Sequence, residues 1–217
     1  MTSAPSPRTR LRRLHDKAAY DFATIAAVLD AQPLAHIGHL VNGAVCVTPT
    51  LQWREGARVF WHGSAASRMI KAALAAPVCL TVTTLDALVL ARSGLEHSVN
   101  FRSVMAFGQP EAVTDPKAKA LHLEAMMDRL VPGRWPQLRP MTAQELRATA
   151  VVSLALTEAS AKIGAGPPTD PPDDMDWPVW AGIIPLRQVL GTPEPAPGLA
   201  AGLTPPVRFP AFGPDQG

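Results

Sequence analysis

Long apolar runs and a strong charge of either sign are both missing from this sequence of 217 residues. The formal net charge is only +2, which argues against a nucleic-acid-binding protein with a strongly basic face. The most apolar stretch, residues 75–91, contains Asp86 and several threonines and is too short to cross a bilayer. Arg12 and Arg13 precede a polar segment rather than the apolar core of a signal peptide. We therefore expect a cytoplasmic protein without a membrane or nucleic-acid partner.

Cysteine is scarce, and several nucleotide-binding and catalytic motifs are absent. The two cysteines, Cys46 and Cys79, cannot complete a structural zinc site, and each lies in an apolar run that indicates a free thiol. Neither a GxGxxG fingerprint nor a P-loop occurs, and no Ser-His-Asp or Cys-His set can be assembled. His36 and His39 have no third ligand nearby, and the aspartates at 170–176 do not have EF-hand spacing. No metal site is predicted.

Turn signals and apolar periodicity predict a β-rich fold with inserted helices. Residues 16–32 have apolar positions on one face, which predicts a helix that Pro33 ends. Asn42-Gly43 is a type I′ hairpin signal between two β-rich runs. Glu55-Gly56 marks a second turn, and a third strand is expected at 57–63. This order indicates an antiparallel meander rather than a βαβ unit.

The rest of the domain alternates helices and strands. Helices are expected at 64–76, where Ser64 or Ser67 can cap the helix, from Pro116, and from the capping box of Thr142 and Glu145. Further strands are expected at 78–91 (one long or bent strand), 100–113 and 150–163. Six or seven strands with helices between them favour an α+β fold, mainly β, built as a small closed barrel with helical decoration.

Both ends of the chain differ in composition from this domain. Residues 1–13 carry four arginines and are expected to form a flexible basic arm, and residues 14–190 form the domain. Thirteen of the 23 prolines lie in the last 54 residues, which excludes interior strands or helices there. This segment is expected to wrap the domain or a partner, and residues 191–217 are expected to be extended or disordered.

The stretch "HGSAASRMIK", residues 62–71, contains the first candidate site. A turn with Gly63 leads into a helix whose first residues include Arg68 and Lys71, three positions apart on one face. Cations normally avoid the positive end of a helix, whereas anions bind there. A bound phosphate explains both cations; the alternative is that both side chains simply reach water.

The stretch "HSVNFRSVMAFG", residues 97–108, contains the second candidate site. If Val104 and Ala106 face the core, Asn100 and Arg102 share their face and Ser103 lies on the other. An inward arginine needs a partner, because an unpaired buried charge is costly. Two partners stay open: a carboxylate such as Asp86, or a bound anion or polar ring system.

Three separated blocks, His62–Leu74, Thr81–Val113 and Ser160–Leu186, occur in this order. Together they resemble the flavin-nucleotide-binding branch of the pyridoxamine 5′-phosphate oxidase-like family, which is related to the nitroimidazole-resistance reductases. The resemblance covers about Arg13 to Leu186 and implies an antiparallel split β-barrel of the FMN-binding type. It also implies a homodimer with flavin at the subunit interface.

The resemblance assigns roles to particular residues. The turn and helix after His62 correspond to the flavin-phosphate site, and the strand with Thr48 and Thr50 would offer backbone groups along the flavin ring. Phe101 stands where the family pattern usually has tyrosine, and the family's usual arginine soon after Lys162 is replaced by Gly164 and Ala165. The implied cofactor-binding residues are Thr48, Thr50, His62, Ser67, Arg68, Lys71, Ser98, Asn100, Arg102, Ser103, Lys162 and Trp180.

The function expected from this resemblance is a flavin-dependent oxidoreductase acting on an unidentified small molecule. FMN is the expected cofactor, FAD is also compatible, and NAD(P)H is a possible electron donor. One alternative is a flavin-binding module for storage or sensing without turnover. A second is a haem-binding split-barrel protein, for which His36 and His39 are the candidate ligands.

Overall fold

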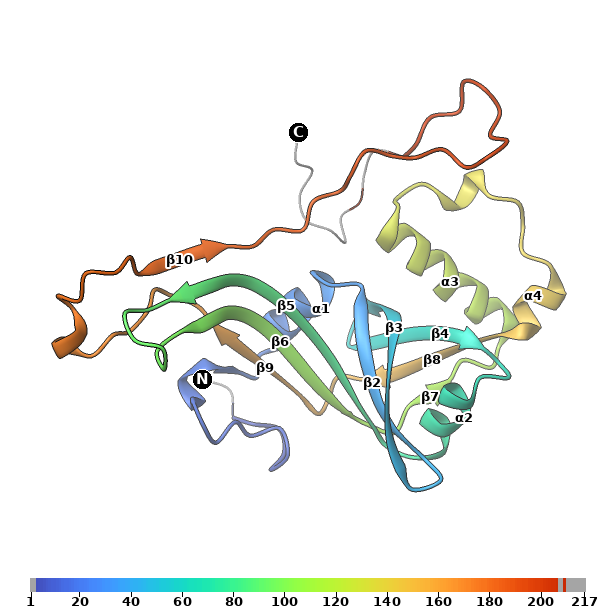
Figure 1. The fold of residues 1–217 in the computed structure, drawn as a ribbon. Helices are drawn as coiled ribbons and strands as arrows, with labels where there is room; N and C mark the ends of the chain where they lie inside the picture. The colour runs from blue at the N-terminus through green and yellow to red at the C-terminus, as the bar shows by residue number, and fades with distance from the viewer. Residues whose placement is uncertain (1–2, 207–208, 210–217) are drawn as a thin grey trace.

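The computed structural model describes residues 3–206 and residue 209, and a single antiparallel sheet dominates them (Figure 1). The strand order is β1-β9-β6-β5-β2-β3-β4-β8-β7, and β10 pairs with β5 off this path. The strands are β1 (Ala18–Ala19), β2 (Leu34–Val41), β3 (Ala44–Glu55), β4 (Arg58–Ser64), β5 (Val78–Leu90), β6 (Ser98–Gly108), β7 (Glu111–Ala112), β8 (Thr149–Ala155), β9 (Ala159–Gly164) and β10 (Gly182–Pro185).

Four α-helices and three 3-10 turns connect the strands. The helices are α1 (Phe22–Asp30), α2 (Arg68–Ala75), α3 (Pro116–Leu130) and α4 (Ala143–Ala148), and the turns are η1 (His15–Lys17), η2 (Trp135–Gln137) and η3 (Pro172–Asp174). The Asp115 cap of α3 and the capping box of Thr142 and Glu145 are present as predicted. The Asn42-Gly43 hairpin is present too, with both residues at positive φ.

The first helix begins later than predicted, at Phe22 rather than near Asp16. Ala18 and Ala19 pair with Lys162 and Ala161 of β9, so these residues extend the sheet instead of a helix. The Asp21 carboxylate then accepts a hydrogen bond from the Thr24 backbone N–H at 2.8 Å and caps α1. Tertiary pairing at the sheet edge therefore overrides the helical periodicity before residue 21.

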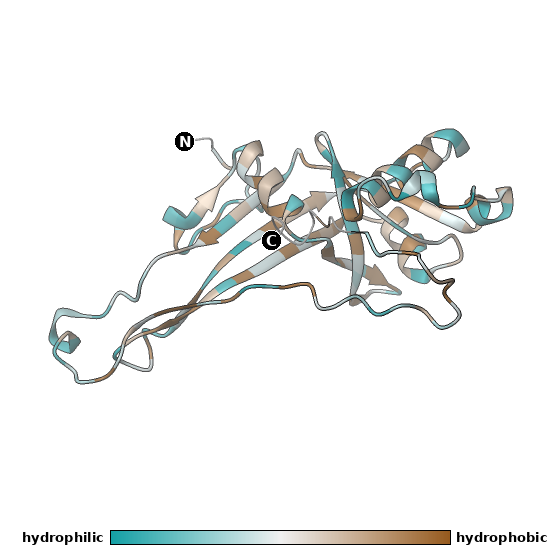
Figure 2. Cartoon of the chain, turned by 90° about the horizontal axis from the view of Figure 1, so that it is seen from above, coloured by the Kyte–Doolittle hydropathy of each residue, from teal (hydrophilic) through white to brown (hydrophobic). Residues whose placement is uncertain are grey.

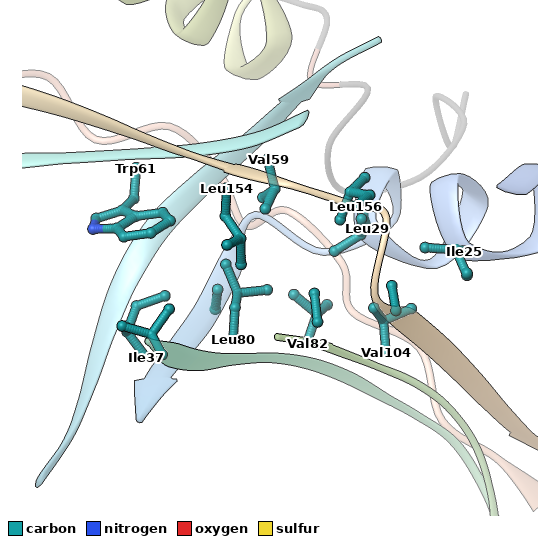
Figure 3. Close-up of a cluster of buried hydrophobic side chains, with 14 of the residues drawn as sticks. Ile25, Leu29, Ile37, Val59, Trp61, Leu80, Val82, Val104, Leu154 and Leu156 are labelled. Atoms are coloured by element: carbon teal, nitrogen blue, oxygen red, sulfur yellow. The ribbon is translucent and has the colours of Figure 1, made fainter. Parts of the chain in front are cut away.

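The main core lies on the concave side of the sheet (Figure 3). Inward side chains from strands on opposite sides of the barrel meet there, and most of them are less than 2% exposed. They include Ile37, Val59, Trp61, Leu80, Val82, Val104 and Leu154. A second cluster, formed by Trp53, Phe60, Leu123 and Val151, lies between α3 and the outer side of β3, β4 and β8.

The barrel is open, so the prediction of a closed barrel was wrong and the split barrel is confirmed. Among the described residues, β1 and β7 form the two ends of the strand order, and no pairing joins them. The long strand β5 bends at a register irregularity between Leu85 and Ala87. Beyond this point β5 and β6 project away from the core as a two-stranded ribbon (Figure 1).

Both terminal segments are attached to this sheet. Arg8 forms an ion pair with Glu158 and lies over the Phe107 ring, and Thr9 is buried, so the N-terminal segment contacts the domain at these residues. Residues 165–190, called the arm below, run along the ribbon and pair with it through the edge strand β10. The chain then continues without helix or strand to residue 206. Residues 207, 208 and 210–217 of the predicted tail lie outside the described residues.

Candidate functional site

The turn before α2 places two cations where no group in the described part of the chain compensates them. Ser64 folds the turn by accepting the Ser67 N–H at its carbonyl and the Ala66 N–H at its hydroxyl. Ser67 is the N-cap, but its side chain makes no capping hydrogen bond. Arg68 and Lys71 are exposed, and within the described chain neither makes an ion pair or a side-chain hydrogen bond. This geometry suits an anion with several oxygen acceptors, such as a phosphate.

His62 lies directly before this turn, on the outer side of β4. Its ring is 6.2 Å from that of Trp53, and burial lowers the pKa of the imidazole, which favours the neutral form. The Nδ1 atom is buried and has no hydrogen-bond partner in the described part of the protein. A buried nitrogen without a partner is unusual, so His62 is a candidate contact for a bound group.

The predicted alternation of β6 is confirmed. Val104 and Ala106 are fully buried, and Asn100 and Arg102 share their side of the strand while Ser103 faces outward. Arg102 forms a bidentate pair with Asp86, with Nε–Oδ2 at 2.9 Å and Nη2–Oδ1 at 2.8 Å. The carboxylate was one of the two partners left open by the sequence. This hydrogen bonding raises the pKa of Arg102, so the guanidinium stays charged.

Asn100 and Ser98 lie where the arm meets the ribbon. The Asn100 amide donates to the Gly166 carbonyl at 3.1 Å, and Ser98 is exposed at the start of β6. Nearby, the Asp170 carboxylate accepts from both the backbone N–H and the guanidinium of Arg92, at 2.7 and 2.8 Å. Asn100 therefore has a structural partner and attaches the arm to the sheet.

The outward residues of β6 and β9 form a small cationic and aromatic group. The Lys162 ammonium lies 5.9 Å from the centre of the Phe101 ring. That ring packs so closely on Gly164 that a Cβ there would lie 2.8 Å from Phe101 Cε1. Gly164 thus provides the space for an aromatic ring at position 101, while Ser103 pairs in register with Lys162.

Three further candidate residues lie elsewhere. Thr48 and Thr50 pair with Ile37 and Ala35, so their side chains share the concave side of β3. Trp180 is on the arm, 62% exposed, and its ring packs against the Cα of Gly182, where a Cβ would lie 2.9 Å away. Trp180 is thus held by the arm but not covered.

One chain does not bring the two candidate sites together. The α2 turn and the start of β6 lie at opposite ends of the molecule (Figure 1). Arg102 pairs with Thr84 of β5, and Val78 at the start of β5 follows α2. Six residues of extended strand separate Val78 from Thr84, which is about 20 Å. The predicted site residues therefore form two separate halves within this chain.

The sequence analysis missed the outer surface that lies between these halves. Outward side chains of β2, β3, β5 and β6 leave an uncovered apolar surface, called the open face below. Its exposed large hydrophobic residues are Leu34, Leu40, Val45, Val47, Leu85, Leu88, Val99 and Met105. Figure 2 also shows apolar segments on the long strands and the arm beside them. The sequence pattern that could have indicated the open face is that these strands carry apolar residues on both of their sides.

Comparison with known proteins gives a family match and full-length structural similarity. The pyridoxamine 5′-phosphate oxidase family profile matches residues 21–163. The flavocytochrome Anf3 from Azotobacter vinelandii is 49% identical, with a TM-score of 0.91 over 94% of this chain and 96% of that one. The FAD and haem binding protein from Mycobacterium smegmatis is 36% identical, with a TM-score of 0.84 over 88% and 94% of the two chains.

A more distant structure shares the fold alone. A nitroimidazole antibiotic resistance protein from Bacteroides thetaiotaomicron is 16% identical, with a TM-score of 0.54 over 67% of this chain and 86% of that chain. No curated protein matches this sequence. Within residues 3–206 and residue 209, no three His, Cys, Asp or Glu side chains cluster as a metal site. None of the helices in the same residues has the length and apolar character needed to cross a membrane.

Proposed function

Because the chain belongs to the pyridoxamine 5′-phosphate oxidase family, we propose that it is a flavin-dependent oxidoreductase that works as a homodimer. The observation that carries the flavin proposal is the α2 turn, where Arg68 and Lys71 have no anionic partner among residues 3–206 and 209. A flavin nucleotide brings a phosphate to this turn and supplies the redox chemistry when bound. The protein's contribution is to bind, orient and shield it.

The separation of the two half-sites supports the dimer. In a pair with twofold symmetry, the same surface of each subunit meets its copy, and opposite ends of that surface come together. Pairing through the open face would bring the α2 turn of one subunit towards the β6 start of its partner. The same contact covers apolar side chains that a single chain leaves in water.

The partners of the flavin follow from this arrangement. Ser67, Arg68 and Lys71 would hold the phosphate, and His62 lies beside it with an unpaired buried nitrogen. Arg102 is already paired with Asp86, so we propose that it orients the ribityl chain or ring of the flavin and does not neutralise the phosphate. Ser98, Asn100, Ser103, Lys162 and Trp180 would contribute from the other half-site, and Thr48 and Thr50 from β3.

FAD is the preferred flavin, because the similar M. smegmatis protein binds FAD. NAD(P)H is the electron donor to test first, and the cytoplasm remains the expected compartment. A second candidate function is supported by the same two relatives, since one is a flavocytochrome and the other binds haem as well as FAD. In this case the chain would hold haem in addition to flavin.

The absorption spectrum of the purified protein tests both candidates. Flavin bands in the near ultraviolet and blue support the first, and an additional Soret band supports the second. Chromatography of the released cofactor separates FAD from FMN. Anaerobic bleaching of the flavin by NADPH or NADH supports an oxidoreductase, whereas a flavin that neither donor reduces points to a storage or sensing module.

Substitution of the α2 cations tests the site. The double variant Arg68→Ala/Lys71→Ala loses two charge-assisted contacts of about 1.5–3 kcal/mol each, so flavin affinity should fall by at least about 100-fold. The control is Arg13→Ala/Lys117→Ala, which removes two exposed cations outside the α2 turn. Normal flavin affinity in the first variant, with the fold retained, would refute the assignment.

A further inference from the structure

Haem binding places specific demands on a protein surface. The iron needs an axial ligand, for which a neutral imidazole is well suited, and the porphyrin needs an apolar surface broad enough for a flat ring. The inference below rests on the second proposed function, that this chain holds haem. It concerns which residue of the chain binds the iron.

Five of the six histidines are poorly suited to this role. His39 is only 5% exposed in the barrel, with Nδ1 at 3.0 Å from the Ile37 carbonyl, and a porphyrin cannot reach it. His122 pairs with Glu55, and His97 contacts the Ser93 carbonyl on the loop before β6. His62 is half-buried, and His15 lies in η1 near the N-terminus.

His36 differs from these in its position on the sheet. It is exposed on the outer side of β2, in register with Pro49 of β3 on one side and Thr81 of β5 on the other. Since β2 lies in the middle of the strand order, the ring projects from within the open face. Among the described residues it makes no side-chain hydrogen bond or ion pair, so both ring nitrogens are available.

The surroundings of His36 suit a flat apolar ligand. Its neighbours on the outer side of β2 are Leu34 and Gly38, and Gly38 lies between Val47 and Cys79 in register. Gly38 therefore leaves a gap in the row of side chains beside the imidazole. A Cβ at this position would meet the Cys79 carbonyl oxygen at 3.4 Å, an ordinary contact, so the gap is only as deep as one missing side chain. None of the residues paired with β2 on this side is charged.

Strand geometry sets the orientation of a ring bound at His36. Side chains on a strand stand roughly perpendicular to the sheet, so the outer nitrogen of the imidazole points away from it, and a porphyrin held there would lie over the sheet surface. In this orientation the ring lies over the apolar side chains around His36. Leu40, Val45 and Val47 are 49%, 79% and 62% exposed without such a cover. A second subunit on the open face would complete the enclosure.

We propose that His36 is an axial ligand of haem iron, with the porphyrin lying on the open face over the gap at Gly38. The ligand is a ferric or ferrous porphyrin, and the imidazole donates a lone pair to its iron. The site is distinct from the α2 turn, so haem and flavin binding can be lost separately.

The test is a titration of the flavin-loaded protein with ferric haem, followed by absorption and electron paramagnetic resonance spectroscopy. His36→Gly should lower haem affinity by at least about 10- to 100-fold, the loss that an outer-shell partner alone already causes. Added imidazole should restore the wild-type Soret position in this variant. Flavin content should not change. The matched control is His97→Gly, which removes another exposed imidazole away from β2.

Each outcome decides between the proposals. If His36→Gly keeps the wild-type Soret position and affinity, or if only His62→Gly loses haem, the assignment of His36 is wrong. If the wild-type protein takes up flavin but no haem, the haem function and this inference both fail while the flavin function stands. If it binds haem through His36 but no flavin, the ligand assignment stands and the flavin proposal fails.

Discussion

Val47 on the open face offers the sharpest test of the proposed dimer. Its side chain is 62% exposed in the single chain and lies on the outer side of β3. Val47→Asp should leave the monomer folded, because the residue contributes nothing to the concave core. In a twofold dimer the substitution occurs twice and introduces two carboxylates into an apolar interface.

The size of the effect follows from the exposed area. Full burial of a valine side chain is worth about 1.5–3 kcal/mol, so the exposed part is worth about 1–2 kcal/mol per subunit. Loss from both subunits gives about 2–4 kcal/mol, and burying each unpaired carboxylate costs several kcal/mol more. The dimer dissociation constant should therefore rise by well over about 100-fold.

Sedimentation or light scattering across a concentration series measures this shift, and the flavin content of each variant is recorded alongside. The matched control is Leu121→Asp on α3, which is 65% exposed and lies off the open face. We expect monomers with reduced flavin for Val47→Asp and an unchanged dimer for the control. A Val47→Asp variant that remains dimeric with full flavin would show that the open face is not the interface.

Three further predictions concern the core, the β6 ion pair and pH. Leu80→Ala in the fully buried core should destabilise the protein by about 2–5 kcal/mol in thermal or denaturant unfolding, far more than Leu88→Ala on the exposed side of the same strand. Arg102→Met should lower the free energy of unfolding by less than about 1 kcal/mol, because the Arg102 and Asp86 side chains are 39% and 34% exposed. A larger loss of stability would contradict this reasoning. Loss of flavin at unchanged stability would support a contact between Arg102 and the cofactor. Burial lowers the pKa of His62 in the folded state, so as the pH falls the unfolded state binds the proton before the folded state does. The free energy of unfolding should therefore fall as the pH drops below about 6.5. Unfolding measured at several pH values should show that His62→Gln lacks this part of the pH dependence.

Much of the fold was predictable because short-range signals specify it. Asn42-Gly43 fixes a hairpin, Asp115 with Pro116 starts α3, and Thr142 with Glu145 starts α4. Each of these depends on residues within a few positions of one another, which local chemistry determines. The start of α1 was not predictable in this way, because Ala18 and Ala19 pair with β9, more than 140 residues away.

The candidate site was predictable in composition but not in arrangement. The sequence identified the α2 cations and the alternation of β6, and the structure confirms that Asn100 and Arg102 share one side of the strand. It left open whether Arg102 meets a carboxylate or a bound anion. The choice of Asp86 depends on a bend in β5, where a register irregularity falls between Leu85 and Ala87.

The sequence by itself indicated most of the strands and helices, the two polar segments, and the two cations at the start of α2. These follow from side-chain periodicity and from helix-terminal electrostatics, which act over a few residues. The expectation of one strand at residues 150–163 was wrong, because they form β8 and β9, and the sequence did not predict β1 or β10. Only the tertiary structure decided that the two half-sites lie at opposite ends of one chain and that His36 projects from an uncovered apolar face. The physical reason is that strand pairing across long stretches of sequence sets which faces are covered, and no local pattern contains that information.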